Sequence, residues 1–247
     1  MRIAVLSDIH GNIDALEAVL SDSCKHHPDA YIFLGDLVFS GLYPQECFDA
    51  LSRKSPIICI KGNTDANLEE VDTFNPSNTF EKQLFDSVID CCDRLTRKAK
   101  VEIAKWPIAH TFTVAGKEIV FCHGSPFSFS DKLSSKEQLD ETLAQQIAQA
   151  GIHTICCGHT HSPADFIIIE THIINVGAVG FSFDGDTRAS YGMFEIAEDR
   201  ISHQIIRVDY DRSRYLSELQ LICDRLPLFR SVAYALERGT PMPNWRD

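Results

Sequence analysis

The sequence predicts an α/β fold, and three features of its first 65 residues support this prediction. Short apolar runs recur and are typical of buried strands, each run ends in a turn that carries Asp, Asn or His, and helical spacing follows the first two turns. Strand, turn and helix in this order indicate βαβ units in a parallel sheet. Because such sheets bind ligands at the carboxyl ends of their strands, the polar turns are expected to meet at one edge.

The first three predicted strands each end in a polar turn. These strands and the residues that follow them are 2–6 with Asp8 and His10, 30–34 with Asp36, and 56–60 with Asn63 and Asp65. Helices are expected over 13–24 and 44–51, the second with Pro44 in its first turn. Asp and Asn are also common turn residues, so no single one of these positions establishes a site.

The repeated pattern of an apolar strand followed by a polar turn ends after the third turn. Residues from about 66 to 106 are polar, lack strand-like runs and contain one helical stretch near 80–95. A helical insertion beside the site is therefore expected, and whether it forms a lid is left open. Its basic residues are interpreted as a solvated helix face rather than a phosphate site. They are Arg94, Arg97, Lys98 and Lys100.

Strand signals return after the insertion. A hairpin over 108–114 and 118–122 leads to His123, and a strand over 153–157 leads to His159 and His161. The other predicted elements are a helix at 136–150 capped by Ser134 or Ser135, paired strands at 165–169 and 172–176, antiparallel strands at 191–196 and 201–208, and helices at 212–223 and 228–237. The loop 177–188 is expected to line the same cleft as the polar turns. One domain over 1–247 is predicted, with a C-terminal helical segment of about 211–247.

Composition limits the classes of partner. A formal charge of -12 and a pI near 5.2 argue against stable binding to nucleic acids or anionic membranes. No run approaches the roughly 20 apolar residues of a membrane span, and no apolar signal-peptide core follows Met1. The nine cysteines lie mostly in apolar runs and form no CxxC pair, which favours reduced, buried thiols. A cytoplasmic location is therefore expected.

The polar strand ends together supply seven oxygen and nitrogen donors. His159 and His161 can both reach one point if their backbone stays extended. The seven residues are Asp8, His10, Asp36, Asn63, His123, His159 and His161. With no cysteine among them, they suit two divalent ions such as manganese, iron, zinc or cobalt. Asp36 is the candidate bridge between ions held roughly 3.5–4 Å apart.

These residues also stand in recognisable motifs. The motifs are Asp8-x-His10, Gly35-Asp36, Gly62-Asn63-x-Asp65, His123-Gly124 and Gly158-His159-x-His161. In this order they resemble the five motifs of the calcineurin-like metallophosphoesterase superfamily, and the chain is similar to its small bacterial and archaeal phosphodiesterase branch. Residues 184–191, reading DGDTRASY, are similar to a loop of that branch. The resemblance covers nearly all of the first 195 residues.

The resemblance implies a four-layered α/β/β/α sandwich, with mixed sheets and a dinuclear centre at the strand ends. It assigns Asp8, His10, Asp36 and His161 to one metal, and Asp36, Asn63, His123 and His159 to the other. A hydroxide shared by the ions would then attack phosphorus in line with the departing oxygen. Asp65 is expected to support the ligands or cap a helix, and Asn12 to cap the first helix.

One position departs from the pattern. Many relatives carry a histidine that helps protonate the leaving group where this sequence has Thr64, so good leaving groups are expected. The expected substrates are small phosphodiesters or nucleoside polyphosphates. A phosphomonoesterase or protein phosphatase, or a scaffold without catalysis, is the alternative, and a homo-oligomer is left open. Arg188 either clamps a substrate phosphate or pairs with Asp184 or Asp186. The other histidines are expected to be structural, among them His172 and His203.

Overall fold

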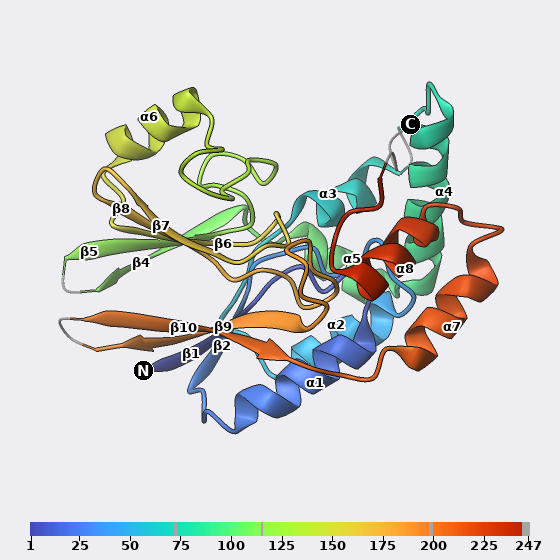
Figure 1. Ribbon diagram of the computed structural model, residues 1–247, viewed down its shortest axis with the longest axis horizontal. Coiled ribbons are helices and arrows are strands. Elements are labelled where there is room, and N and C mark those ends of the chain that lie inside the picture. Colours follow the sequence, from blue (N-terminus) through green and yellow to red (C-terminus); the bar gives the residue numbers. More distant parts are fainter. Residues whose placement is uncertain (72–73, 115, 198–199, 244–247) are drawn as a thin grey trace.

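A computed structural model describes residues 1–71, 74–114, 116–197 and 200–243, and within them the chain forms ten strands and eight helices (Figure 1). The strands are β1 (Arg2–Leu6), β2 (Ala30–Phe33), β3 (Ile58–Cys59), β4 (Ala109–Val114), β5 (Lys117–Cys122), β6 (Thr154–Cys157), β7 (Ala164–Ile168), β8 (Thr171–Asn175), β9 (Ala189–Ile196) and β10 (Ile201–Val208). The helices are α1 (Ile13–Cys24), α2 (Pro44–Arg53), α3 (Asn63–Glu70), α4 (Thr79–Arg94), α5 (Arg97–Ala104), α6 (Glu141–Ala150), α7 (Ser213–Ile222) and α8 (Phe229–Arg238).

Two mixed sheets of five strands each form the centre of the molecule. Sheet A has the strand order β10-β9-β1-β2-β3, and sheet B has the order β4-β5-β6-β8-β7. The neighbours β1, β2 and β3 are parallel, as are β5, β6 and β8, while the pairs β1–β9, β9–β10, β4–β5 and β7–β8 are antiparallel. Helices α1 and α2 cover sheet A and α6 covers sheet B, which confirms the predicted four layers (Figure 1).

The period-two alternation of the strands explains how the layers pack. In β1, Ile3 and Val5 join the core between the two sheets, whereas Ala4 and Leu6 face the core shared with α1. The same alternation divides β5 and β6 between the inter-sheet core and the core under α6. Strands that are buried on both faces lack a polar side, which is why they read as continuous apolar runs in the sequence.

The segment 66–106 forms three helices, so the prediction of one helical stretch was incomplete. Helix α3 begins at Asn63 directly after the polar turn, and α5 begins after Thr96, whose hydroxyl accepts a hydrogen bond from Ala99 N (3.2 Å). Both helices have only eight residues, too few for a periodic apolar face to be visible in the sequence. Their starts depend instead on local capping.

Helix α6 begins later than predicted. Its N-cap is Asp140, whose carboxylate accepts a hydrogen bond from Leu143 N (3.0 Å), and neither Ser134 nor Ser135 caps it. Asp and Ser are similarly good caps, so composition alone did not separate these positions. At the other end Gly151 adopts φ 66, as expected for a glycine that terminates a helix.

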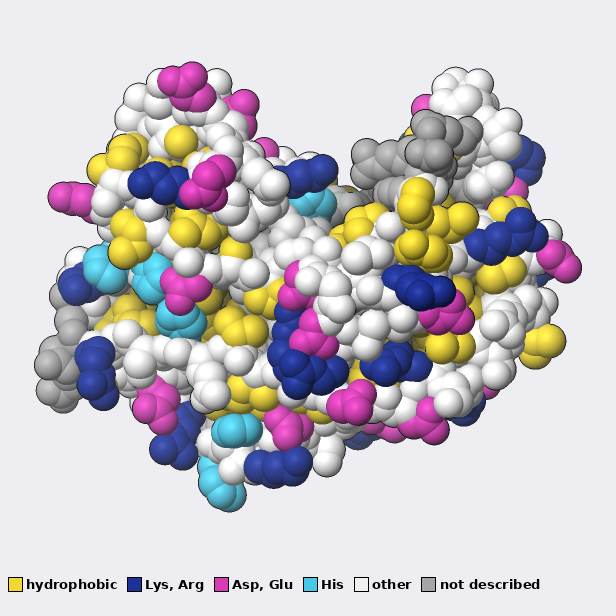
Figure 2. Space-filling model, in the orientation of Figure 1, with side chains coloured by type: hydrophobic (Ala, Val, Ile, Leu, Met, Phe, Trp, Pro, Cys, Tyr) yellow, Lys and Arg dark blue, Asp and Glu magenta, His cyan; other side chains and the backbone are white. Residues whose placement is uncertain are grey.

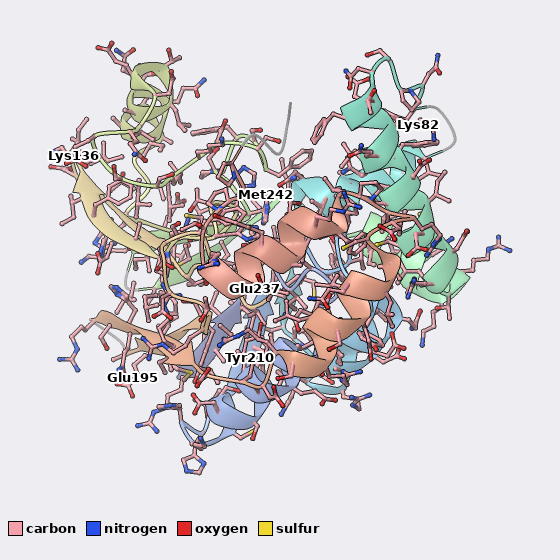
Figure 3. All side chains as sticks on the ribbon, turned by 45° about the vertical axis from the view of Figure 1, so that its right-hand side comes forward. Lys82, Lys136, Glu195, Tyr210, Glu237 and Met242 are labelled. Carbon is pink, nitrogen blue, oxygen red and sulfur yellow. The ribbon has the colours of Figure 1, made fainter. Side chains whose placement is uncertain are left out.

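The C-terminal helices α7 and α8 form a separate small core, and Figure 3 turns them toward the viewer. Tyr215, Leu219 and Phe229 pack there against Leu42, which lies in the loop after β2. The Tyr215 hydroxyl also hydrogen-bonds Leu42 N (3.0 Å), so these helices are tied to a loop that carries site residues. Within the described ranges, no helix combines the length and apolar character needed to cross a bilayer.

Candidate metal centre

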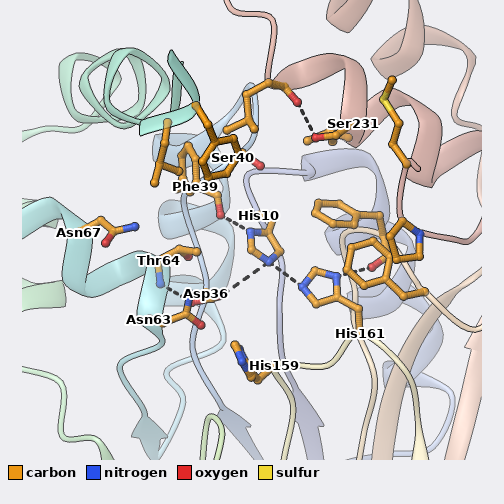
Figure 4. A pocket seen from close by; sticks show the side chains of 18 residues that line it. His10, Asp36, Phe39, Ser40, Asn63, Thr64, Asn67, His159, His161 and Ser231 are labelled. Atoms are coloured by element: carbon orange, nitrogen blue, oxygen red, sulfur yellow. Dashed lines mark hydrogen bonds and ion pairs between the residues drawn. The ribbon is translucent and has the colours of Figure 1, made fainter. Parts of the chain in front are cut away.

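Five polar loops converge at the carboxyl ends of β1, β2, β3, β5 and β6. Backbone hydrogen bonds join loops of distant sequence: Asp8 N donates to Gly35 O (2.9 Å), His10 N to Asp36 O (3.0 Å) and Gly158 N to His123 O (2.9 Å). His159 N also donates to Asp8 Oδ2 (2.9 Å), 151 positions away, so distant segments meet at one edge. Figure 4 shows His10, Asp36, Asn63, His159 and His161 around this point.

Most of the candidate ligands have a strained backbone. The left-handed φ values are 55 at Asp8, 49 at His10, 60 at Asp36, 66 at His159 and 56 at His161. This conformation costs a residue with a side chain roughly 1–2 kcal/mol. An extended backbone was the condition under which His159 and His161 could reach one point, and this condition is not met, because both residues have left-handed φ values. Strain of this kind persists where surrounding contacts enforce it and is concentrated at functional sites.

Asp8, His10 and His161 form a first group whose ligand atoms all lie within 4.8 Å of one another. Asp8 Oδ1 is 3.3 Å from His161 Nε2 and 3.8 Å from His10 Nε2. The two imidazole nitrogens are 3.1 Å apart. Asp8 is fully buried, and Oδ1 has no hydrogen-bond partner. A buried, unpaired carboxylate oxygen is costly unless a cation satisfies it.

Asp36, His123 and His159 form a second group, whose ligand atoms also lie within 4.8 Å of one another. Asn63 Oδ1 lies 3.0 Å from His123 Nε2 and adds an amide oxygen. Asp36 Oδ2 is 3.3 Å from His123 Nε2 and 3.6 Å from His10 Nε2, which belongs to the first group. The carboxylate of Asp36 therefore lies between the groups, and His159 and His161 belong to different ones.

Backbone carbonyls fix the orientation of three imidazoles. The Nδ1 atoms of His10, His123 and His161 contact the carbonyl oxygens of Phe39, Leu34 (2.8 Å) and Phe181 (2.7 Å), respectively. A carbonyl oxygen only accepts, so Nδ1 carries a proton and Nε2 of each ring faces the centre. Metal-binding histidines in proteins are oriented in this way.

Asp65 holds two of the loops together. Its Oδ2 accepts hydrogen bonds from Asp36 N (2.8 Å) and Gly62 N (3.0 Å), and its Oδ1 accepts one from Leu37 N (2.9 Å). It lies at the third position of α3, so one carboxylate caps this helix and fixes the backbone of Asp36. Burial and the charge of Asp36 raise the pKa of Asp65 to about 6.

Asn12 and two glycines complete the support. Asn12 caps α1 by accepting from Ala15 N (3.1 Å), as predicted, and its amide also donates to Gly180 O (2.8 Å). A Cβ at Gly62 would collide with Asp36, and one at Gly158 would collide with Asp8 Oδ2. Both positions therefore require glycine because a carboxylate lies against the backbone.

The buried charges strongly perturb one another. Burial opposes the charged form of Asp36, but His123 first and His10 next lower its pKa to about 2. The pKa of His123 rises to about 9, since Asp36 and Asp8 outweigh its burial. Burial and the neighbouring His123 lower the pKa of His159 to about 4. The centre thus strongly favours a positive charge next to its two carboxylates.

The donor set fits divalent metal ions. Its oxygens and imidazole nitrogens converge without any thiolate, and the buried Asp8 Oδ1 has no hydrogen-bond partner. Binding of metal ions would displace the proton that these carboxylates otherwise attract to an imidazole. Nine cysteines occur as free thiols, and none belongs to this centre.

A cavity of about 370 Å³ opens above the centre. Its lining residues are His10, Asp36, Phe39, Ser40, Asn63, Thr64, Asn67, Phe80, Leu84, His159, His161, Phe181, Phe183, Leu228, Ser231, Val232, Pro241 and Met242. They come from α3, α4, α8 and the loops, so helices of the 66–106 segment and of the C-terminal segment flank the cavity. Figure 2 shows the outline hollowed between the lobes that carry α6 and α4.

The walls of this cavity were only partly predicted. Phe181 stacks on the ring of His10 (centroids 4.9 Å apart) and lies tilted against that of His161 (4.7 Å), and Phe183 stacks on His161 (4.6 Å). The loop 177–188 lies at the cleft as expected, but no pattern in the sequence indicates these aromatic contacts. Arg188 does not line the cavity and instead pairs with Asp186 (2.6 Å), so of its two predicted roles the structure has the ion pair.

Comparisons with known proteins agree with this geometry. Residues 1–199 match the family model of the calcineurin-like phosphoesterase superfamily domain. An uncharacterised protein of Methanocaldococcus jannaschii is 28% identical over 248 residues, which cover 91% of this chain and 93% of that protein. A metallophosphoesterase from Sphaerobacter thermophilus is 26% identical, with a TM-score of 0.75 and coverage of 97% and 99% of the two chains.

A hypothetical protein from Pyrococcus horikoshii shares the fold. Its TM-score is 0.78 at 20% identity, with 98% of this chain and 99% of that chain covered. The predicted family and fold are therefore confirmed. The chain belongs to the calcineurin-like phosphoesterase superfamily and is an enzyme of the metal-dependent phosphoesterase class.

Proposed function

We propose that this chain hydrolyses small phosphodiesters, with nucleoside polyphosphates as a second substrate class, and that its seven strand-end residues hold two divalent ions. Manganese is the first choice of metal, with iron, zinc and cobalt as alternatives for this donor set. When bound, such ions supply positive charge beside the phosphoryl oxygens and lower the pKa of water. Asp36 is the proposed bridge between the ions.

The observation that carries this proposal is the position of Asp36 between two ligand groups at the base of one cavity. Its Oδ2 lies 3.6 Å from His10 Nε2 on one side and 3.3 Å from His123 Nε2 on the other. The carbonyls of Phe39 and Leu34 hold these two imidazoles in place, so the ligands need little rearrangement when metals bind. Asp65 keeps the backbone of Asp36 fixed through the hydrogen bond to its N–H.

The cavity walls favour a substrate with low charge. Among the lining residues of the described chain none is Lys or Arg, whereas Phe39, Phe181, Phe183, Leu84 and Val232 form apolar surface. A second phosphate far from the metals would lose its hydration without gaining a cation, which ranks nucleoside polyphosphates behind diesters as substrates. A diester carries a single negative charge and offers two organic groups for the apolar wall. An aromatic or otherwise apolar ester is therefore the preferred substrate.

Paired hydrolysis assays test this proposal. Bis(4-nitrophenyl) phosphate should be cleaved faster than 4-nitrophenyl phosphate in the presence of Mn²⁺, and Asp36→Asn should abolish turnover of both esters. Metal analysis of the same preparations should find about two ions in the wild type. A strong preference for the monoester would overturn the diesterase assignment, and an unchanged rate for Asp36→Asn would overturn the metal-centre assignment.

Thr64 predicts how the rate depends on the leaving group. Its N–H donates to Asp36 Oδ1 (2.9 Å), and its buried hydroxyl has no hydrogen-bond partner. A threonine hydroxyl is not an effective proton donor near neutral pH, so the rate should fall steeply as the leaving-group pKa rises. Thr64→His, at the wall of the cavity, should make this dependence shallower, while the isosteric Thr64→Val should leave it steep. A flat dependence in the wild type would contradict the prediction.

A further inference from the structure

Three polar side chains meet at the open edge of the sandwich, away from the candidate metal centre. Asp165 lies on β7, His172 on β8 and His203 on β10. Strand β10 is the edge of sheet A and β7 is the edge of sheet B, so the cluster joins two sheets. Figure 2 shows histidine and acidic side chains gathered on the side of the molecule where these strands lie.

Strand register directs all three side chains into the space between the sheets. Asp165 pairs with Ile174, and His172 lies two residues before Ile174 on the same strand, so both share the face of Ile174. Ile174 belongs to the inter-sheet core, and so does Phe194, the register partner of His203. The cluster therefore closes this core at its solvent edge.

Both imidazoles point their Nε2 atoms at one carboxylate. His172 Nε2 is 2.6 Å from Asp165 Oδ1, and His203 Nε2 is 2.9 Å from Asp165 Oδ2. The three ligand atoms lie within 4.8 Å of one another. Ligand atoms of a tetrahedral zinc site stand about 3.4 Å apart, as bond lengths near 2.0–2.1 Å require. Small side-chain rotations would bring these atoms to that spacing.

The surroundings leave room for a fourth, solvent-derived ligand. A cavity of about 160 Å³ is lined by His172 and His203, and the Asp165 side chain is 54% exposed. The ring of His203 is only 15% exposed and stacks on Phe194 (centroids 5.7 Å apart), which holds it in place. Lys117 and Arg200 also line this cavity, and their charges oppose a cation. Binding should therefore be weaker than at a structural site with four protein ligands.

We propose that Asp165, His172 and His203 bind one divalent transition-metal ion, with Zn²⁺ the best match to two imidazoles and one carboxylate. The ion would tie β10 of sheet A to the β7–β8 pair of sheet B. The spacing of the three residues in the sequence gives no sign of such a site, because they come from two different sheets. Both histidines were accordingly expected to be structural.

Zinc titration of the metal-free full-length chain tests the proposal. The background variant Cys24→Ser removes an exposed thiol that could bind zinc adventitiously. Equilibrium dialysis followed by metal analysis should find about one zinc ion fewer per chain in His172→Gln/His203→Gln than in the background. His110→Gln, the same substitution on β4 outside the cluster, should retain the full zinc content.

Two further readouts separate binding from folding. Asp36→Asn is added to the Cys24→Ser background to weaken the candidate metal centre. Added Zn²⁺ should raise the thermal midpoint of this variant, and the rise should disappear when His172→Gln/His203→Gln is introduced as well. Asp165→Asn, which preserves side-chain size, should weaken zinc binding at least tenfold while circular dichroism stays unchanged. Phosphoesterase activity with Mn²⁺ should stay within about twofold in the double histidine variant. Unchanged zinc content and an unchanged thermal response in that variant would overturn the proposal.

Discussion

The candidate metal centre and the edge cluster use the same side-chain types on very different backbones. Asp8 and His161 are buried and have left-handed backbones, in loops held by contacts from distant segments. Asp165, His172 and His203 lie on regular strands that point them inward by simple alternation. At the centre, Oδ1 of Asp8 has no hydrogen-bond partner, whereas both oxygens of Asp165 accept hydrogen bonds from imidazoles.

The two regions therefore differ in how favourable their folded backbone and side chains are without a metal ion. Five strained residues and a buried, unpaired oxygen lower the stability of the metal-free centre, so the fold must enforce them. The edge cluster has ordinary backbones and a satisfied carboxylate, so it is stable with or without an ion. We therefore expect catalysis to depend on the centre alone, and a metal at the edge to affect stability.

The largest expected effect comes from a matched pair of carboxylate substitutions. Asp8→Asn should lower kcat/KM on an aryl diester at least ~100-fold, because an amide is a poorer ligand for a divalent ion than a carboxylate. Asp165→Asn should leave kcat/KM within about twofold of the wild type. Steady-state kinetics with saturating Mn²⁺ measure both variants, and circular dichroism verifies their folding. Similar losses in the two variants would remove the functional distinction between the regions.

A moderate effect is expected when the loop support is removed. Asp65→Ala leaves the N–H groups of Asp36, Leu37 and Gly62 without their acceptor and should lower the free energy of unfolding by about 2 kcal/mol. Metal affinity should fall roughly 10–100-fold, since the backbone of Asp36 is no longer fixed. Urea unfolding in chelator and calorimetric titration with Mn²⁺ measure the two quantities.

Asp65→Asn provides the control for that variant. It keeps one acceptor oxygen of the same geometry, so its losses should be intermediate. If Asp65→Ala lost stability but kept its metal affinity, Asp65 would support only the fold and not the ligands.

The smallest effect is expected at the exposed pair of Asp186 and Arg188. The Arg188 side chain lowers the pKa of Asp186 to about 2, the value also found for buried Asp36. A lowered pKa stabilises the fold above the unfolded value of 3.8, and this contribution is lost as the pH falls toward about 2. Solvent screening limits it to less than ~1 kcal/mol.

Thermal melts of the wild type and Asp186→Asn at several pH values test this small, pH-dependent contribution of Asp186 to stability. The difference in thermal midpoint should be small at pH 7 and should vanish below the pKa of Asp186. A large difference at pH 7 would mean that the loop 184–188 contributes more to stability than an exposed ion pair explains.

The sequence by itself determined the strand ends that carry the candidate ligands. Apolar runs, period-two alternation and polar turns depend on local chemistry, so Asp8, Asp36, Asn63 and His123 could be located along the chain before their contacts were known. The family resemblance added the four layers and the division of His159 and His161 between two groups. Short helices were missed because capping, and not periodicity, defines α3 and α5.

Only the tertiary structure decided the features that arise where distant segments meet. The left-handed backbones of His159 and His161, the carbonyls that orient three imidazoles, and the aromatic wall of Phe181 and Phe183 depend on contacts between loops. The edge cluster exists because two sheets bring β7, β8 and β10 together. A linear pattern encodes which face a strand buries, but the partner across the sandwich depends on how the sheets pack.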